Sequence, residues 1–367
     1  MYIILAILLL AILIVVHEFG HFMAARAMKI DVREFAVGFG PKLAGWKSKK
    51  YETTFAVRAI PMGGYCSFYG EDDAAGEYKD DPRAFGKHSV WKRMFVILMG
   101  PVMNFVLAFV AATVLIWCIG MTVPTEKEEY DPFIQEVMAA GPAHEAGLKN
   151  GDQVLEINGK DMMDGTMETL LDTISTWKEE DGPLHMKILR GGETVETDVT
   201  PAWNEEAQKM QIGVYIGGYR RAETVRVGFF GGFREAWKLC TNAGGAILRA
   251  LKDLVTKGEG LEDTAGPVGI VSVISTEVAG QVQQGGFGAG MSTFVQLLIL
   301  ISINLGLMNL LPIPGLDGSR IVFGVIEAVR GKPVPLQKEA IVHLIGMGLL
   351  LALMVFFTFR DVMRLFQ

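Results

Sequence analysis

The sequence of 367 residues contains little cysteine and little charge. Three cysteines, Cys66, Cys118 and Cys240, are too few and too scattered for a disulfide framework, and no CxxC pair is present for zinc or redox chemistry. Charged residues make up 20% of the chain and the net charge is −7, so we expect no nucleic-acid partner. Half of the residues are hydrophobic and the mean hydropathy is +0.31. These values indicate a membrane protein with a soluble part.

Four apolar segments are long enough to cross a bilayer as helices, which takes about 20 residues. They are residues 2–25, 95–119, 294–311 and 341–359. Basic residues follow the first segment, from Arg26 on, and precede the second, up to Arg93, so residues 26–93 are predicted to be cytoplasmic. The N-terminus and residues 120–290 are then predicted to be extracytoplasmic. The C-terminus is then also predicted to be extracytoplasmic, although the basic residues near it would favour the cytoplasm by the positive-inside rule.

The stretch VVHEFGHFMAAR, residues 15–26, places ionisable groups inside the first apolar segment. On an α-helix the spacing of His17 and His21 puts both imidazoles on one face, with Glu18 beside them. This HExxH pattern offers zinc two nitrogen ligands and a carboxylate that can take a proton from water. Two structural histidines in a helix bundle are the alternative. Ionisable groups at membrane depth are costly and usually functional, which favours the zinc site.

A third zinc ligand is expected from another membrane segment, because a catalytic zinc has three protein ligands. The stretch NLLPIPGLDGSR, residues 309–320, supplies Asp317 just after the third apolar segment. Pro312 and Pro314 cannot continue a helix, so Asp317 is predicted on an irregular stretch. Such backbone is tolerated at membrane depth where it lines protein or a water-filled cavity. The alternative is a simple turn that leaves the membrane.

Five motifs follow one another along the chain: HEFGH, VRAIPMGGYCSFYGE (57–71), GPVMNFVLAF (100–109), GPVGI (266–270) and NLLPIPGLDG (309–318). In this order they resemble the site-2 protease family (M50) of intramembrane zinc metalloproteases. The most similar branch contains the bacterial regulator-of-sigma-E protease and its Gram-positive counterpart. Two features depart from it. The chain holds one PDZ-like region where the sigma-E enzyme has two, which favours the single-PDZ form, and it reads LDGSR where many relatives read LDGGH.

The resemblance implies specific roles for residues of this chain. His17, His21 and Asp317 match the ligands of a Zn²⁺ cofactor, and Glu18 matches the general base. Asn304 and Asn309 match asparagines implicated in substrate handling; interhelical hydrogen bonds are their alternative role.

The segment 51–71 is rich in residues that favour β-strands, and Gly63 and Gly64 follow its proline. We predict a cytoplasmic or membrane re-entrant β-hairpin whose exposed edge can receive an unwound substrate strand, with the two glycines as candidate substrate contacts. A hairpin that only braces the fold is the alternative.

The remaining soluble part contains the expected PDZ-like domain, residues 124–218, where Gly147, Gly151 and Asp152 mark turns. Either it binds peptides by strand addition or it restricts access to the membrane cavity, and we favour restriction. In the linker, residues 219–290, an amphipathic helix at 233–258 would lie on the outer membrane surface or, as we favour, on the PDZ-like domain. Residues 280–290, GQVQQGGFGAG, would form a flexible hinge.

The predicted fold is therefore a mainly α-helical membrane protein with four transmembrane helices, a membrane-associated β-hairpin and one inserted extracytoplasmic α+β domain of PDZ type. An N-terminal membrane part, residues 1–120, and a C-terminal one, residues 291–367, flank the insertion.

The predicted function is intramembrane zinc-dependent proteolysis in the cell membrane of a bacterium, with the active site towards the cytoplasm. By resemblance, its partners are single-span membrane proteins already cut by another protease, such as anti-sigma factors, and remnant signal peptides. A membrane-anchored PDZ adaptor with a vestigial metal site is one alternative. A transporter with a His and Asp relay is another, disfavoured by four spans and no internal repeat.

Overall fold

The computed structural model describes residues 2–71, 78, 81–124, 130–138, 141–163, 167–205, 208–220, 222–258, 260 and 265–365. The chain forms two compact units. The helical unit combines Met1–Cys118 with Val227–Gln367, and the β unit is Ile119–Arg226. Each unit is described by itself below.

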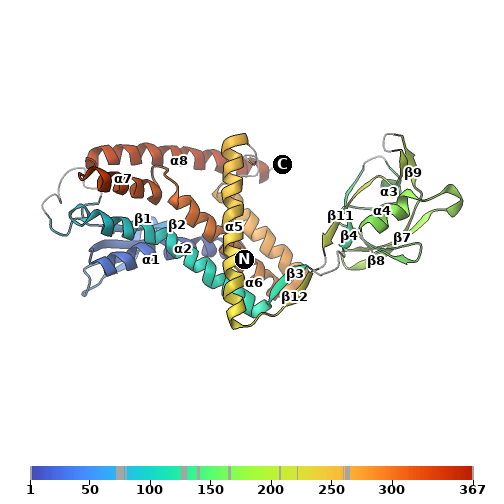
Figure 1. Cartoon of the computed structure of the whole chain (residues 1–367), viewed down its shortest axis with the longest axis horizontal. Coiled ribbons are helices and arrows are strands. Elements are labelled where there is room, and N and C mark those ends of the chain that lie inside the picture. Colours follow the sequence, from blue (N-terminus) through green and yellow to red (C-terminus); the bar gives the residue numbers. More distant parts are fainter. Residues whose placement is uncertain are drawn as a thin grey trace. The chain divides into compact units, whose positions relative to one another are not determined.

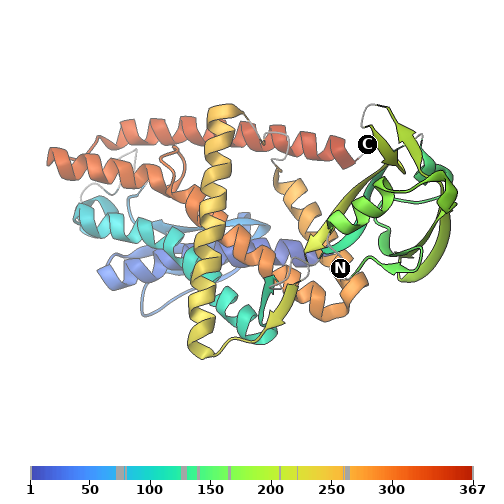
Figure 2. The same ribbon diagram turned by 45° about the vertical axis from the view of Figure 1, so that its right-hand side comes forward.

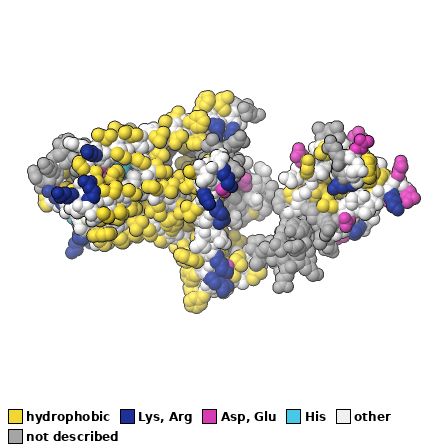
Figure 3. Space-filling model, turned by 45° about the horizontal axis from the view of Figure 1, so that its top comes forward, with side chains coloured by type: hydrophobic (Ala, Val, Ile, Leu, Met, Phe, Trp, Pro, Cys, Tyr) yellow, Lys and Arg dark blue, Asp and Glu magenta, His cyan; other side chains and the backbone are white. Residues whose placement is uncertain are grey.

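The helical unit is dominated by long helices, four of which contain stretches apolar and long enough to cross a membrane (Figure 1). Its helices are α1 (Tyr2–Met28), α2 (Val90–Ile119), α5 (Phe229–Lys257), α6 (Pro267–Leu310), α7 (Asp317–Arg330) and α8 (Leu336–Leu365). The candidate spans lie in α1, α2, the second half of α6 and α8, which confirms the four predicted segments and lengthens each of them. Apolar side chains cover most of the visible face of these helices (Figure 3).

A buried stripe along α1 explains how this helix packs. Ala6, Leu9 and Leu13 recur every three or four residues, and the stripe continues through His17 and His21. The apolar part packs against Ile274 and Leu298 of α6. Because the histidines continue the same stripe, helix packing points them into the unit and away from lipid.

A twisted β element packs against α1, formed by β1 (Val32–Lys47) and β2 (Thr54–Phe68). Residues 34–37 pair on one side with 64–67 and on the other with 54–57, and residues 44–47 also pair with 54–57. The prediction of a hairpin within 51–71 was wrong, because residues 54–57 and 64–67 pair with β1 and not with each other, so β2 is one arm of a larger element. Its partner arm, β1, was not predicted, because VREFAVGFGPKLAGWK is interrupted by glycines and a proline.

Helix α6 replaces the predicted flexible hinge. Residues 280–290 are helical apart from a kink at Gly286, whose φ is 75°. The prediction was wrong because Ile274 and Val278, just before this segment, are buried against α1 and hold the helix in place. Glycine-rich composition weakens a helix by only about 1 kcal/mol per residue, which such burial offsets.

Helix α5 packs within the helical unit, on α2 and α6, which are not the partners that the sequence analysis favoured. Its apolar face, with Ala236 and Ile247, contacts Ile116 of α2 and Ile303 of α6. Figures 1 and 2 both show α5 crossing over α6 instead of running alongside it. Amphipathic periodicity predicted the helix and its apolar face, but the surface that this face covers depends on contacts distant in sequence.

The motif GPVGI begins α6 and receives a carboxylate from α8. Gly269 donates its backbone N–H to Oδ2 of Asp361 at 2.7 Å, and Asp361 is buried. A carboxylate at a helix N-terminus satisfies free amides and complements the helix dipole. A Cβ on Gly266 or Gly269 would lie within 3 Å of this carboxylate, so both glycines make room for it.

The β unit has its own hydrophobic core beneath a six-stranded sheet. The sheet runs β11 (Val214–Arg220), β4 (Tyr130–Val137), β5 (Gln153–Ile157), β7 (Leu184–Arg190) and β8 (Glu193–Val199), with β6 (Lys160–Asp161) pairing with β5. Two short helices, α3 (Pro142–Glu145) and α4 (Met167–Ser175), accompany it. Separate pairs are formed by β3 (Met121–Pro124) with β12 (Ala222–Val225) and by β9 (Ala202–Asn204) with β10 (Lys209–Gln211). This mixed composition agrees with the predicted β-containing domain.

The predicted turn before β5 is held by a buried ion pair. Arg190 donates from Nε and Nη2 to the two carboxylate oxygens of Asp152 at 2.7 and 2.6 Å, and the Lys149 N–H donates to Oδ2 at 2.8 Å. Burial raises the pKa of Asp152, but these donors outweigh it and the pKa lies below its ordinary value. Asp152 therefore anchors the turn in its ionised form.

This pair makes the stability of the β unit depend on pH. Because the pKa of Asp152 is lower in the folded state than in the unfolded state, its contribution is complete above about pH 4 and is lost as the pH falls through the folded pKa. At neutral pH we expect Asp152→Asn to cost about 2 kcal/mol of unfolding free energy and to flatten the acid dependence. Urea unfolding of residues 119–226, followed by the fluorescence of Trp177 and Trp203, measures both. Asp198→Asn, at an exposed pair with His185, should cost under about 1 kcal/mol; an equal cost at both sites would contradict the prediction.

Candidate metal centre

Two helices pack closely at the position of the HEFGH motif. A Cβ on Gly20 would lie only 2.2 Å from the carbonyl oxygen of Met99 on α2, so only glycine allows this approach. His17 and His21 lie on the same side of α1 and are each 7% exposed. The close contact therefore turns both imidazoles towards α2 and seals them from lipid.

Asp317 is brought to the histidines by the break after α6. The chain is irregular from Leu311 to Leu316. Asp317 was predicted to lie on this irregular stretch, but it is the first residue of α7. Helix α8 holds the irregular segment: the Gly315 N–H donates to Nδ1 of His343 at 3.2 Å. A Cβ on Gly346 would lie 2.2 Å from the Pro314 carbonyl oxygen, so α8 and the loop are in tight contact.

Three donor atoms form a triangle of the size that a metal ion requires. Nε2 of His17 and Nε2 of His21 are 3.2 Å apart, and Oδ2 of Asp317 lies 3.1 Å from the first and 3.4 Å from the second. Donors bonded to a tetrahedral zinc at about 2.0–2.1 Å lie about 3.3 Å from one another. Asp317 Oδ2 is buried and accepts no well-formed hydrogen bond from the described residues. These side chains fit a zinc ion, and among the described residues they form a group whose donor atoms lie close enough together to hold one.

The far side of each imidazole contacts α2. Nδ1 of His21 donates to the Val96 carbonyl oxygen at 2.9 Å, and Nδ1 of His17 lies 3.0 Å from the side-chain amide of Asn104. Since a carbonyl only accepts, the proton of a neutral His21 is on Nδ1 and the lone pair is on Nε2, inside the triangle.

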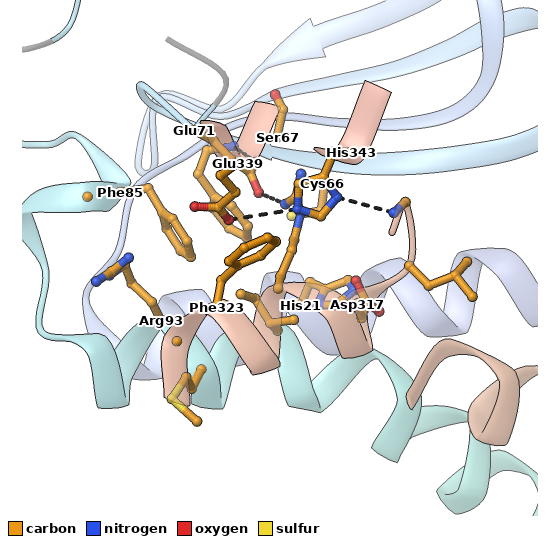
Figure 4. A pocket seen from close by; sticks show the side chains of 18 of the residues that line it. His21, Cys66, Ser67, Glu71, Phe85, Arg93, Asp317, Phe323, Glu339 and His343 are labelled. Atoms are coloured by element: carbon orange, nitrogen blue, oxygen red, sulfur yellow. Dashed lines mark hydrogen bonds and ion pairs between the residues drawn. The ribbon is translucent and has the colours of Figure 1, made fainter. Parts of the chain in front are cut away.

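The cluster opens into a cavity of about 700 Å³, which Glu18 also lines. Figure 4 shows the side chains that surround it, contributed by α1, α2, β2, α7 and α8. Residues 64–68 of β2 form one wall, and a Cβ on Gly64 would lie 3.5 Å from Cγ of Glu18. Cys66 lines the same cavity as Glu18. Thus the end of β2 lies directly beside Glu18.

Two ion pairs tie the cavity walls to α7. Arg320 pairs with Glu71, just after β2, and Arg93 of α2 pairs with Glu327. Arg320 is one of the two residues, with Ser319, at which this chain departs from the LDGGH pattern. Its guanidinium connects α7 to the end of the β element through the ion pair with Glu71.

The other residues singled out from the sequence are dispersed. Gly64 lines the cavity, whereas Gly63, with φ at 125°, is packed under the ring of Phe39. Asn304 is exposed on α6 and Asn309 is partly buried, and neither is among the residues that line the cavity. A role of these asparagines in substrate handling stays a prediction.

Comparison with known proteins places this chain in a family. The model of peptidase family M50 matches residues 5–353. The chain belongs to peptidase family M50. It is similar along its whole length to the regulator of sigma-W protease RasP of Bacillus subtilis. The two are 31% identical over an alignment of 438 positions that covers 98% of each chain. The zinc metalloprotease RasP of Geobacillus kaustophilus is 32% identical over 434 residues, which cover 96% of each chain.

These relatives confirm the resemblance to the site-2 proteases of the RasP branch. This M50 peptidase is a multi-pass membrane protein and a zinc metalloprotease.

Sequence reasoning gave no role to several residues at the centre of this peptidase. Val96, Gly100 and Asn104 of α2 and His343 of α8 contact the imidazoles or the Asp317 loop. The first three are spaced by four residues, a helical period that could have identified a common face. His343 gave no such signal, because its contact with Gly315 joins segments with no shared pattern.

Proposed function

We propose that this chain cleaves single-span membrane proteins within the membrane, using zinc held by His17, His21 and Asp317, with Glu18 as general base. The observation that supports this most directly is the triangle of three buried donor atoms beside a carboxylate in one cavity. Glutamate is not needed to hold the ion, and it faces the cavity, where a water and a peptide can reach it.

The side chains divide the chemistry among them. When bound, zinc supplies Lewis acidity, which polarises the scissile carbonyl and lowers the pKa of a water towards about 7. Glu18 accepts a proton from the attacking water and later delivers it to the leaving amine. The burial of His17 and His21 excludes bulk water and keeps both imidazoles in fixed positions.

The end of β2 is the proposed docking edge for the substrate. Residues 64–67 pair with 34–37 on one side, and no pairing is found on the other side within the described residues. A transmembrane helix must unwind before a protease can reach its peptide bonds, and an extended strand needs partners for its free amides. Strand addition to residues 64–67 supplies these partners directly beside Glu18.

The site is proposed to face the cytoplasm, close to that membrane boundary. His21 precedes Arg26 by five residues, about 8 Å along the helix axis. Basic residues end α1 and begin α2, and such ends lie inside the cell by the positive-inside rule. Figure 3 shows Lys and Arg side chains at one end of the helical unit and, in a second group, along the middle of the visible face. The N-terminus and the β unit are then extracytoplasmic, on the opposite side.

The proposed substrates are single-span proteins with a shortened extracytoplasmic part, such as anti-sigma factors, and remnant signal peptides. One similar protein, RasP of Bacillus subtilis, is a regulator of sigma-W by its name. The β unit is proposed to be a PDZ-like domain that restricts access of untrimmed proteins. A protease inside the bilayer needs such restriction, because every membrane helix is otherwise a potential substrate.

Cleavage by purified protein tests the proposal. The full chain in detergent is mixed with a single-span reporter, and zinc per chain and product are measured before and after chelation. We expect about one zinc per chain, loss of cleavage on chelation and recovery with added zinc. A chain that binds no zinc, or cleavage that survives zinc removal, would contradict the proposal and favour a membrane-anchored PDZ adaptor with a vestigial site.

Cross-linking tests the docking edge. With Cys118 and Cys240 replaced by serine, Cys66 should form a disulfide with single cysteines in the reporter at every second position around the scissile bond, because side chains alternate along a strand. Burial raises the pKa of the Cys66 thiol, so the reaction is run above pH 8 with diamide. Moving the cysteine from position 66 to position 65 should shift the pattern by one residue. A period of three to four would instead indicate a substrate that binds as a helix.

A further inference from the structure

The motif GPVMN, residues 100–104 of α2, lies against His17 and His21, although none of its residues belongs to the proposed zinc triad. Val96, Gly100 and Asn104 are each four residues apart, so they lie along one face of α2. All three contact the imidazoles of α1. One helical face therefore lies against both predicted zinc ligands.

The middle position provides space. A Cβ on Gly100 would lie 2.3 Å from Nε2 and 2.4 Å from Cε1 of His21, and 3.0 Å from Cε1 of His17. Any other residue would displace the imidazoles from the donor triangle. Pro101, which follows, cannot donate a backbone hydrogen bond within the helix.

The two outer positions hold the rings by their Nδ1 atoms. Val96 accepts from His21 Nδ1, which leaves the Nε2 lone pair in the triangle. Asn104 is fully buried and its amide lies 3.0 Å from Nδ1 of His17. In the orientation with Nδ2 towards the histidine, Oδ1 of Asn104 is buried and has no hydrogen-bond partner among the described residues.

The opposite amide orientation is the one compatible with metal binding by His17. A half-turn of the amide brings Oδ1 towards His17, where it accepts the Nδ1 proton and leaves the Nε2 lone pair free for a metal. Nδ2 in that place would instead require a lone pair on Nδ1 and a proton on Nε2, which prevents metal binding by a neutral ring. Ser302 of α6 holds the backbone at this position, since its hydroxyl donates to the backbone carbonyl oxygen of Asn104 at 2.8 Å.

We infer that Asn104 is a positioning residue which accepts the Nδ1 proton of His17 through Oδ1, and that Gly100 and the Val96 carbonyl complete this outer support of the zinc ligands. The inference rests on the proposed zinc site. Partners of this kind set the tautomer and orientation of metal-binding histidines, and their removal typically weakens metal binding about 10- to 100-fold.

Zinc retention in the full chain tests the inference without reference to cleavage. Zinc per chain and the rate of zinc removal by a chelator are measured in detergent for Asn104→Leu, Asn104→Asp and Gly100→Ala. We expect Asn104→Leu and Gly100→Ala to bind zinc about 10- to 100-fold more weakly. Asn104→Asp should retain zinc, because a carboxylate also accepts the Nδ1 proton.

Two control substitutions show whether zinc loss comes from losing contacts to the zinc ligands or from a general loss of helix stability. Thr113→Val removes a buried hydroxyl from the same helix, and Gly348→Ala adds a methyl group on α8, where the described part of the chain leaves open space within 4 Å. Both should retain zinc as the wild type does.

Three results are decisive. Wild-type zinc retention in both Asn104→Leu and Gly100→Ala would overturn the inference, and so would zinc loss in a folded Asn104→Asp. If Asn104→Asp does not fold, the other two variants decide. A wild-type chain without zinc would overturn the proposed function itself.

Discussion

Replacing Glu18 by glutamine is expected to abolish cleavage while zinc stays bound. Glutamine keeps the size and hydrogen-bonding capacity of the side chain beside Cys66, but it cannot accept the proton of the attacking water. Removal of a general base typically lowers the rate about 10²- to 10⁴-fold. The effect should fall on kcat and leave KM close to its wild-type value, because the carboxylate acts on the water and not on substrate binding.

The measurement is single-turnover cleavage of the reporter, together with zinc per chain. Glu277→Gln, at an exposed position on α6, provides a matched change of charge and should leave both quantities unchanged. Cleavage by Glu18→Gln at the wild-type rate would remove this residue from the mechanism. Zinc loss in this variant would instead make Glu18 a ligand and contradict the assigned roles.

Replacing Asp317 by asparagine is expected to remove zinc and cleavage together. The substitution keeps the shape of the side chain, so α7 can still begin at this residue, but it removes the negative charge that faces two imidazoles at 3.1 and 3.4 Å. The remaining two histidines provide fewer than the three ligands of a catalytic zinc. The loss of cleavage should be at least as large as for Glu18→Gln, because the water is then no longer activated at all.

Metal analysis distinguishes the two variants. Zinc per chain should fall close to zero for Asp317→Asn and remain near the wild-type value for Glu18→Gln. Asp253→Asn, at a surface pair with Lys257 on α5, is the matched control and should retain zinc and cleavage. Full zinc retention in Asp317→Asn would mean that the third ligand is another residue.

The arrangement of α2 shows where sequence patterns stop being informative. His17, Glu18 and His21 could be placed on one helical face from their spacing alone, since a helix fixes the relation between residues four positions apart. The same period joins Val96, Gly100 and Asn104, but it does not say that this face meets the histidines. That contact depends on the close approach of α1 and α2 at Gly20 and Met99.

The elements that were predicted wrongly all depended on distant contacts. The partner arm β1 is held by pairing with residues 54–57 and 64–67. Residues 280–290 are helical because the preceding turns of α6 pack on α1. The apolar face of α5 was evident from its period, but the choice of α2 and α6 as its partners was not. In each case burial against another element outweighed the local preference.

By itself the sequence determined the four membrane spans, the HExxH face and the aspartate that follows the third span, because each is written in local spacing and composition. Only the tertiary structure decided that Asp317, about 300 residues away from His17, meets both histidines within 3.4 Å. It also decided that the end of β2 lies beside Glu18 and that Asn104 faces His17. The physical reason is that zinc ligation and strand addition need atoms placed within a few tenths of an ångström, and packing between distant segments sets such positions.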